Sequence, residues 1–361
     1  MVLNYTKAWL KTKEEFIDSR IEDTIEVTIL VAARNEEENI FNCINSLLNQ
    51  SYKKELVEII LLDDFSEDNT VEIAKQFMAV KILQLKEFLG EAFQYKANKK
   101  RAISLGVEQA KNKVIITTDG DCVYYKNWLK SKMQFYSKTQ AKMITSPVLF
   151  FSEESVFSKF MELDLISLMG ITAAGIKNKL PSMVNGANLL FEKAAFEEVN
   201  GFEGNENIAS GDDVFLMQKI HQVYPNTIKF LKNNEAVAFT KAPKNFTEFV
   251  NQRIRWTSKS KKHANPKVRN VLVVNVLFYL ILTFGLFVLP FFNFNYFKIS
   301  IVLFGLKMLV DFIFFKNLTY FFAKEKLLRS FLIIEIMHLP YISILGFLSL
   351  LSNYTWKGRK V

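Results

Sequence analysis

Short apolar runs alternate with segments of helical spacing through the first part of the chain. The apolar runs are residues 25–33, 57–62, 80–85 and 113–118. Residues 36–49 and 99–110 lie between them and place their apolar side chains on one helical face. Short apolar strands separated by helices predict an α/β fold with a mostly parallel sheet that helices cover on both faces.

Beyond residue 270 the pattern changes to long apolar runs. Residues 271–293 hold no charged side chain and are long enough to cross about 30 Å of hydrocarbon. Residues 299–315 carry Lys307 and Asp311, which lie four residues apart on one helical face and can pair inside a bundle. A third run, residues 331–351, contains one acid, one histidine and one proline. We therefore expect three membrane segments, because few polar positions remain to face water in a soluble helical domain.

Basic residues beside these runs indicate their orientation. The twenty residues before the first run contain no acid and seven basic residues: Arg253, Arg255, Lys259, Lys261, Lys262, Lys267 and Arg269. This asymmetry predicts that the N-terminal part lies in the cytoplasm. The next loop would return to the same side, and it is basic too, with Lys316, Lys324, Lys326 and Arg329. The tail, with Lys357, Arg359 and Lys360, would then lie outside unless the segment that contains Pro340 is re-entrant.

Composition sharpens this division into two parts. The 361 residues include 34 Phe, too many for an ordinary soluble protein of this size, and they concentrate in the apolar runs. Disordered and collagen-like chains are excluded by the 50% hydrophobic content. We expect a juxtamembrane segment at residues 1–24, an α/β domain at residues 25–265 and a membrane domain at residues 266–361. Whether a membrane helix precedes Met1 stays open.

The net charge of +9 suits nucleic acid, an anionic membrane or a phosphorylated ligand. We expect no nucleic-acid partner, because the basic residues crowd the membrane edge and anionic lipid already accounts for them. Cys43 and Cys122 show neither metal-binding spacing nor a disulfide framework, which favours a reducing compartment. None of the three histidines, which include His338, has ligand partners in sequence, so none is assigned a catalytic role.

Acidic residues follow the predicted strands, where ligands bind in parallel sheets. Asp63 and Asp64 follow the second apolar run, and this segment taken alone favours a turn with a helix cap at Asp68 or Asn69. Asp119 and Asp121 flank a glycine, and this spacing allows both carboxylates to face one hard cation. Mg²⁺ or Mn²⁺ takes carboxylate oxygens together with substrate phosphates, so the pair suits a metal–diphosphate site.

Three further segments carry candidate chemistry. Asp212 and Asp213 follow Gly211 at the head of a predicted helix, and helix capping explains only one of them. Residues 252–256 read QRIRW, either an interfacial basic helix with a tryptophan anchor or a contact for phosphate and sugar. Residues 156–176 form an apolar helical stretch that either lies at the membrane interface or packs in a core.

The ordered set of these segments resembles the family 2 glycosyltransferases, which are inverting enzymes with a GT-A fold. The resemblance covers residues 27–256 and rests on these stretches in this order: VTILVAARNEEENI, LLDDFSEDNT, NKKRA, TTDGDC, NGANLLFEKAAFEEVNGF, SGDD and QRIRW. Each stretch alone is weak, but the ordered set followed by a membrane tail is specific. Asn98 departs from the pattern, because many members have Gly before the basic residue.

The resemblance implies a role for each matching residue. Donor-binding positions would be Ala33, Arg34, Asn35, Glu36, Asp64, Lys99, Asp119 and Asp121. Asp119 and Asp121 would hold Mg²⁺ or Mn²⁺, Asp121 most directly, and Asp213 beside Asp212 would act as the general base. The sugar and acceptor pocket would be lined by Asn185, Gly186, Asn188, Gln252, Arg255 and Trp256.

The resemblance and the apolar runs together predict an integral membrane enzyme, in a bacterial plasma (inner) membrane with its catalytic domain in the cytoplasm. It would move a sugar from a UDP- or GDP-linked donor to a lipid or polyprenyl-linked acceptor. Two alternatives stay open: a processive polysaccharide synthase, and a non-catalytic membrane protein that binds nucleotide sugars. The sugar, the nucleotide base and the acceptor are not identified by the sequence.

Overall fold

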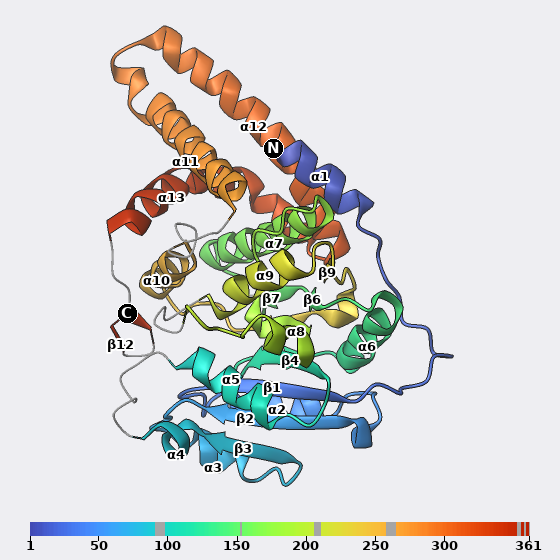
Figure 1. Cartoon of the computed structure of the whole chain (residues 1–361). Coiled ribbons are helices and arrows are strands. Elements are labelled where there is room, and N and C mark those ends of the chain that lie inside the picture. The colour runs from blue at the N-terminus through green and yellow to red at the C-terminus, as the bar shows by residue number, and fades with distance from the viewer. Residues whose placement is uncertain are drawn as a thin grey trace. The chain divides into compact units, whose positions relative to one another are not determined.

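The computed structural model describes residues 1–90, 98–151, 154–205, 211–257, 265–351, 355–356 and 359–360. Lys259, Lys261, Lys262 and Lys357 of the expected basic flanks lie outside these residues. The chain forms two compact units (Figure 1). The helical unit comprises Met1–Lys11, Ser152–Ala174 and Ala242–Tyr354, and the sheet unit comprises Thr12–Phe151, Gly175–Lys241 and Thr355–Val361. Residues 152–174 therefore group with the apolar C-terminal helices, and the expected domain limits stay a prediction.

A seven-stranded sheet in the order β3-β2-β1-β4-β8-β6-β9 forms the centre of the sheet unit. Its strands are β1 (Val27–Ala33), β2 (Val57–Asp63), β3 (Val80–Gln84), β4 (Val114–Asp119), β6 (Met143–Thr145), β8 (Leu189–Glu192) and β9 (Ile228–Phe230). The pairs β2–β3, β1–β2, β1–β4 and β6–β9 are parallel, whereas β8 is antiparallel to both β4 and β6. The α/β fold with a mostly parallel sheet is thereby confirmed.

The sheet unit contains further helices and short strands. The helices are α2 (Ile40–Leu48), α3 (Thr70–Ala74), α4 (Leu85–Leu89), α5 (Lys99–Gln109), α6 (Trp128–Thr139), α8 (Lys193–Glu198) and α9 (Asp212–Val223), with short 3₁₀ turns η1 (Lys54–Leu56), η3 (Gly186–Asn188) and η4 (Asn234–Ala236). Strands β5 (Val123–Tyr124), β10 (Ala238–Thr240) and β7 (Val148–Phe150) form a second small sheet, and β11 (Thr355–Trp356) pairs with β12 (Arg359–Lys360).

The core explains why these segments fold as they do. Every residue of β1 except Ala32 is buried, as the continuous apolar run predicts. Buried side chains of α5, α8 and α9, including Ile103, Phe196 and Met217, share one cluster with strand residues such as Leu30. The carboxyl ends of β1, β2 and β4 therefore form one edge, and the loops that follow them are held in fixed positions.

Helix α2 begins at Ile40, four residues later than the spacing predicts. Asn35 has a positive φ of 52°, and the backbone N–H of Glu36 donates to the Thr70 hydroxyl at 2.7 Å. This bond and the backbone conformation of Asn35 hold the residues after β1 in a turn, so α2 starts after that turn. Asn69 occupies the cap position of α3 but makes no side-chain cap bond, whereas the carboxylate of Asp68, the other expected residue, accepts from the Thr70 N–H at 3.0 Å.

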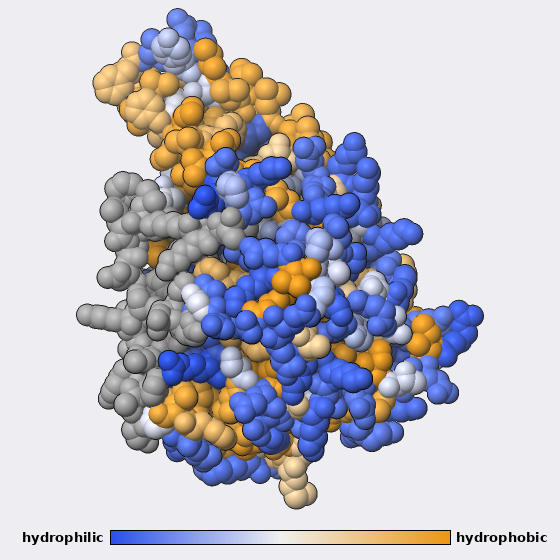
Figure 2. All heavy atoms as spheres, in the orientation of Figure 1, coloured by the Kyte–Doolittle hydropathy of each residue, from blue (hydrophilic) through white to orange (hydrophobic). Residues whose placement is uncertain are grey.

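The helical unit consists of long helices. They are α1 (Val2–Lys11), α7 (Val156–Lys177), α10 (Phe246–Thr257), α11 (Pro266–Phe287), α12 (Phe294–Phe321) and α13 (Phe331–Leu351), with 3₁₀ turns η6 (Leu289–Phe291) and η7 (Glu325–Ser330). Helix α11 packs against α12 and α13, α1 packs against α12, and α10 packs against α13. Figure 2 shows hydrophobic side chains gathered over α11 and α12.

Two stretches among the described residues are long and apolar enough to cross a membrane, Pro266–Phe291 and Glu325–Gly346. They contain most of the first and of the third expected run, whereas the second expected run is not among them. Pro340 lies inside the continuous helix α13. The second expected run lies in α12, where the predicted ion pair forms between Lys307 and Asp311 at 2.9 Å. Lys307 also pairs with Glu335 of α13, so two apolar helices share one buried charged group.

Candidate active site

Arg34 fastens the loops that follow β1 and β2. Its guanidinium donates to the carbonyl oxygens of Asp64 (2.8 Å) and Phe65 (2.6 Å) and lies 3.1 Å from the Glu67 carboxylate. Only 6% of Arg34 is exposed, so its guanidinium bonds to groups of the protein itself. The Asn35 side chain adds a bond by accepting from the Glu67 N–H at 2.9 Å. Both residues, which were expected to bind the donor, thus shape the loop that follows β2.

Three other expected donor residues lie in the same loops. The Ala33 carbonyl accepts from the Asp64 N–H at 2.9 Å, which joins β1 to β2 at their ends. Glu36 is buried and accepts from the Asn39 amide at 2.7 Å. Asp64 is buried as well, and its carboxylate accepts from the Asn98 amide at 3.3 Å. Asn98, the departure from the family pattern, therefore links β2 to the first turn of α5.

Gly120 allows the loop after β4 to pass close to β1. A Cβ at this position would lie 3.0 Å from the Ala33 Cβ and 3.3 Å from the Glu36 Cγ, both too close for ordinary packing. The Gly120 N–H donates to the Ala32 carbonyl at 2.9 Å. The close approach explains why a glycine separates the two aspartates of this loop.

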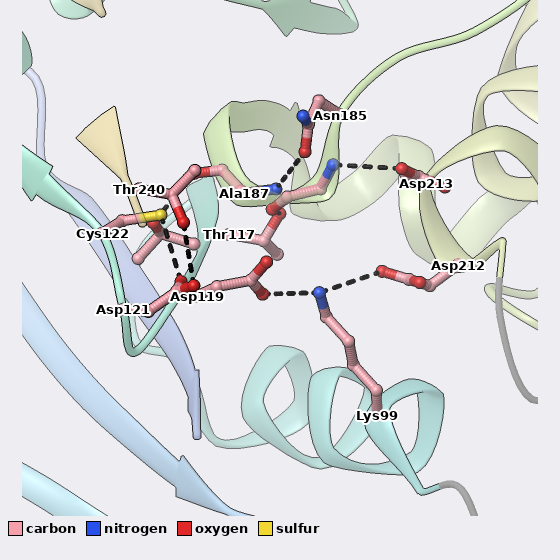
Figure 3. A network of polar contacts seen from close by, with 12 residues as sticks. Lys99, Thr117, Asp119, Asp121, Cys122, Asn185, Ala187, Asp212, Asp213 and Thr240 are labelled. Atoms are coloured by element: carbon pink, nitrogen blue, oxygen red, sulfur yellow. Dashed lines mark hydrogen bonds and ion pairs between the residues drawn. The ribbon is translucent and has the colours of Figure 1, made fainter. Parts of the chain in front are cut away.

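Both oxygens of Asp121 accept hydrogen bonds (Figure 3). The Thr240 hydroxyl donates to Oδ2 at 2.8 Å, and the Cys122 thiol lies 3.6 Å from Oδ1. Burial and nearby carboxylates raise the pKa of both cysteine thiols, so neither is an activated nucleophile. Neighbouring donors that orient a carboxylate are typical of residues around a metal ligand.

Lys99 joins the two acidic pairs. Its ammonium lies 2.6 Å from Asp119 Oδ1 and 3.8 Å from Asp212 Oδ2 (Figure 3). Burial alone would lower the pKa of Lys99, but Asp119 and Asp212 raise it well above its usual value. The lysine therefore remains charged at neutral pH and places a positive charge at the centre of the site.

Asp212 and Asp213 occupy the first two positions of α9. The cap position belongs to Gly211, which has a positive φ of 86° and no side chain that could make a cap bond. The Asp213 carboxylate accepts from the Val214 N–H of the first helical turn at 2.7 Å, so its position at the helix end accounts for Asp213, as expected, but not for Asp212. The Gly186 N–H donates to Asp213 Oδ2 at 3.2 Å, and a Cβ on Gly186 would lie 3.1 Å from Asp212 Oδ2 and 3.8 Å from the Lys99 ammonium.

Hydroxyl groups of β4 hold the segment around Gly186 in place. The Thr117 and Thr118 hydroxyls of β4 donate to the carbonyls of Gly186 and Ala187, each at 2.9 Å. The half-buried Asn185 accepts from the Ala187 N–H at 3.0 Å. Asn188 differs from its expected role in a pocket, because its side chain is fully buried and its amide donates to two backbone carbonyls at 2.6 and 2.8 Å. It supports the segment and is not exposed to a ligand.

Gln252, Arg255 and Trp256 lie on α10 and belong to the helical unit. All three are half-buried, whereas Arg253 between them is fully buried. Arg253 contacts Asp164 of α7 through two nitrogens, at 2.8 and 2.7 Å. From the sequence, Arg253 was expected only as part of the basic flank before the first apolar run, and Asp164 had no expected role. The available signal was the presence of two acids, Glu162 and Asp164, in an otherwise apolar helix.

The chemistry of the Asp-x-Asp loop fits a divalent cation that a substrate completes. Asp119 and Asp121 offer carboxylate oxygens, the ligands that Mg²⁺ and Mn²⁺ prefer. Among the described residues no group of three or more ligating side chains could hold a metal alone. Two carboxylates are enough when phosphate oxygens supply further ligands, so the donor set matches a metal that binds together with a diphosphate.

Comparisons with known proteins agree with this arrangement. The sequence model "Glycosyl transferase family 2" matches residues 28–199, and "Glycosyl transferase family group 2" matches residues 114–315, which is more than half of the chain. Glycosyltransferase AglE of Haloferax volcanii is 32% identical over 124 residues, 34% of this chain and 40% of that protein. A poly-beta-1,6-N-acetyl-D-glucosamine synthase of Staphylococcus aureus is 25% identical over 245 residues, 66% of this chain and 55% of the synthase. The matches thus span about half or less of these relatives.

A solved structure shares the fold. It is the mannosyltransferase PcManGT from Pyrobaculum calidifontis in complex with GDP-Man and Mn²⁺, with a TM-score of 0.57 and 15% identity over 93% of this chain and 94% of that chain. At this identity the likeness concerns the fold alone. Because the two sequence models together extend from β1 to α12, this chain belongs to the family 2 glycosyltransferases and has their GT-A fold.

Proposed function

We propose that this chain is a membrane-bound inverting glycosyltransferase, which moves a sugar from a UDP- or GDP-linked donor to a lipid or polyprenyl-linked acceptor. The observation that carries the proposal is the position of Lys99 between Asp119 and Asp212, with Asp213 and Gly186 beside it. The Lys99 ammonium thereby connects the carboxylates suited to a metal with those suited to proton transfer.

The donor side of the reaction follows from these contacts. The leaving nucleoside diphosphate develops negative charge, and the Lys99 ammonium is placed to stabilise it. A divalent cation held by Asp119 and Asp121 would add positive charge at the same oxygens. The loops fastened by Arg34 and Asn35 would surround the nucleoside.

Direct displacement requires a base for the attacking hydroxyl. Asp213 is half-buried, and the backbone N–H groups of Gly186 and Val214 fix the direction of its carboxylate. Such a carboxylate can accept the proton as the hydroxyl oxygen attacks the anomeric carbon from the face opposite the leaving diphosphate. Asp212, paired with Lys99, would hold the lysine rather than take the proton.

The helical unit supports a membrane acceptor. Helix α11 exposes large apolar side chains along its length. Only 11% of the most apolar stretch within Pro266–Phe291 is buried. A surface of this kind is unfavourable in water and suits hydrocarbon. The same unit carries Gln252, Arg255 and Trp256 on α10, which we assign to the acceptor. The enzyme would then lie in a bacterial inner membrane with its sheet unit in the cytoplasm.

The central experiment measures donor turnover by the full chain in detergent or nanodiscs. UDP- and GDP-linked sugars are incubated with Mn²⁺ or Mg²⁺ and bacterial lipids, and release of UDP or GDP is recorded. Asp213→Asn is expected to lower turnover by at least about a thousandfold while nucleotide affinity stays within about threefold, since a base acts on the reaction and not on donor binding. Equal turnover by Asp213→Asn and the unchanged chain would contradict the assignment of the base.

A second candidate is a processive polysaccharide synthase, which the match to the poly-N-acetylglucosamine synthase over 66% of the chain favours. Product length separates the two functions. A single labelled sugar in the lipid extract supports the lipid enzyme, whereas a ladder of water-soluble products supports the synthase.

A further inference from the structure

A buried charged cluster joins three helices of the helical unit. Asp164 of α7 accepts from the Arg253 Nε of α10 at 2.8 Å through Oδ2, and its Oδ1 lies 3.2 Å from the His338 Nε2 of α13. The Asp164 and Arg253 side chains are 7% and 3% exposed. Burial alone would raise the pKa of Asp164, but Arg253 and His338 hold it below its usual value, so the pair is ionised.

Arg253 in turn contacts two residues of the Gln-x-x-Arg-Trp motif. Its Nη1 donates to the Gln252 Oε1 at 2.7 Å. Its guanidinium carbon lies 4.4 Å from the centre of the Trp256 ring and 4.6 Å from that of Phe249. A planar guanidinium with ring contacts, two hydrogen bonds and a close ion pair leaves little freedom for the side chains that it touches.

We propose that Asp164 is a positioning residue for the acceptor side of the reaction: it holds Arg253, and Arg253 fixes the Gln252 amide and the Trp256 ring. This inference rests on the proposed function, because the acceptor role of α10 is part of that proposal. Asp164 has no assigned part in the chemistry itself, and it acts only through Arg253.

The contact of Asp164 with His338 links α7 to α13 as well. Helix α13 overlaps a stretch long and apolar enough to cross a membrane, so Asp164 ties the motif helix to a candidate membrane helix. The His338 ring also stacks on Tyr341 at 5.5 Å, and Tyr341 stacks on Phe249 of α10 at the same distance. Polar and aromatic contacts therefore fix one rotational setting of α10 against α13.

The test compares two neutralised acids of the same helix. Asp164→Asn removes the charge that faces Arg253. Glu162→Gln is the matched control, because Glu162 is equally buried in α7 but pairs with Lys324 at 2.6 Å. Asp164→Glu keeps the charge and serves as the conservative variant. Each variant is studied as the full chain in nanodiscs, with acceptor KM, transfer kcat, and the affinities for UDP and GDP with Mn²⁺.

We expect Asp164→Asn to raise acceptor KM and lower kcat/KM for the acceptor about a hundredfold, as misplacement by about 1 Å does. Nucleotide affinity should stay within about twofold, and Asp164→Glu should recover at least about a tenth of the lost activity. Glu162→Gln should change neither parameter by more than about threefold. Equal losses at the donor and the acceptor, or equal losses in both neutralised variants, would show a general structural role and overturn the inference.

A spectroscopic measurement keeps the inference testable if the unchanged chain transfers no sugar. The four tryptophans are labelled with 5-fluorotryptophan, and the Trp256 resonance is assigned by its loss in Trp256→Phe. Asp164→Asn should move this ¹⁹F resonance, and Glu162→Gln should not. No turnover with any donor would refute the proposed function, whereas an unmoved Trp256 resonance in Asp164→Asn would refute the positioning role.

Discussion

Replacement of Lys99 by Met should change the affinities for metal and for nucleotide in opposite directions. The ammonium of Lys99 lies 2.6 Å from an oxygen of Asp119, the same carboxylate that we assign to the metal. Lysine and cation therefore compete for Asp119 before the donor binds. Once the donor is present, the lysine and the cation both attract the diphosphate, so the loss of either weakens nucleotide binding.

The size of the effect follows from the geometry. A charge pair at the 2.6 Å separation is worth about 1.6 kcal/mol in water and about 6 kcal/mol at an effective dielectric constant of about 20. The Asp119 side chain is 36% exposed and that of Lys99 is 20% exposed, so solvent screens the pair and the lower figure applies. About 1.5 kcal/mol corresponds to about tenfold in a dissociation constant.

Isothermal titration calorimetry of the full chain provides the assay. Lys99→Met should bind Mn²⁺ alone about tenfold more tightly, and UDP or GDP at saturating Mn²⁺ about tenfold more weakly. Lys100→Met is the control, because the neighbouring lysine donates to the Asn205 carbonyl at 2.6 Å and should leave both affinities within about twofold. A parallel fall of both affinities in Lys99→Met would refute the competition, as would the same pattern in Lys100→Met.

Three further changes test the sheet unit. Burial lowers the pKa of Lys132 to about 7, so the folded protein binds this proton less tightly than the unfolded chain, and stability is lost as pH falls from about 10.5 towards 7. Lys132→Met should therefore raise the free energy of unfolding by about 1–4 kcal/mol at pH 6 and by less at pH 9, and equal gains at both pH values would contradict this explanation. Thr240→Val removes a hydrogen-bond donor to Asp121 and should weaken Mn²⁺ binding about tenfold. In the unchanged chain, EDTA should abolish sugar transfer and Mn²⁺ should restore it. Unchanged Mn²⁺ affinity in Thr240→Val would show that this bond does not orient the carboxylate. Gly120→Ala should lower the free energy of unfolding by about 1–3 kcal/mol, as measured by denaturant titration. Gly305→Ala is the control and should not lower it, because no atom lies within 4 Å of the added Cβ.

The strands and the site loops were predictable because their signals are local. Continuous apolar runs gave β1, β2, β3 and β4 to within two residues, since a strand buried on both faces needs an apolar side chain at nearly every position. Acidic residues at the ends of these strands indicated the site, because parallel strands end at one edge. The short strands β5, β6, β7 and β10 carry two or three residues each, too few for a pattern to show.

The roles of single polar residues were harder to predict. Arg34 matches a donor-binding position, yet its guanidinium bonds the carbonyls of the next loop. Asn188 matches a pocket position, yet its amide is fully used by buried carbonyls. In both cases the partners are backbone oxygens from residues about thirty or more positions away in sequence, and no side-chain pattern shows where a backbone carbonyl will lie. A residue that supports a site and one that contacts its ligand therefore look alike in the sequence.

Arg253 is a different case, because the helical period contains the information. Gln252, Arg255 and Trp256 are spaced at i, i+3 and i+4 on α10. Arg253 lies four residues after Phe249 and three before Trp256, so it borders the motif side chains on the face that Phe249 occupies. Phe249 is apolar, so that face is the one expected to pack inward, and a buried arginine requires an acid. The apolar helix α7 offers Glu162 and Asp164 as candidates. The existence of a buried Arg–acid pair behind the motif could thus have been predicted. The choice between two acids that point to different sides of α7 depends on how α7 and α10 pack, which only the structure provides.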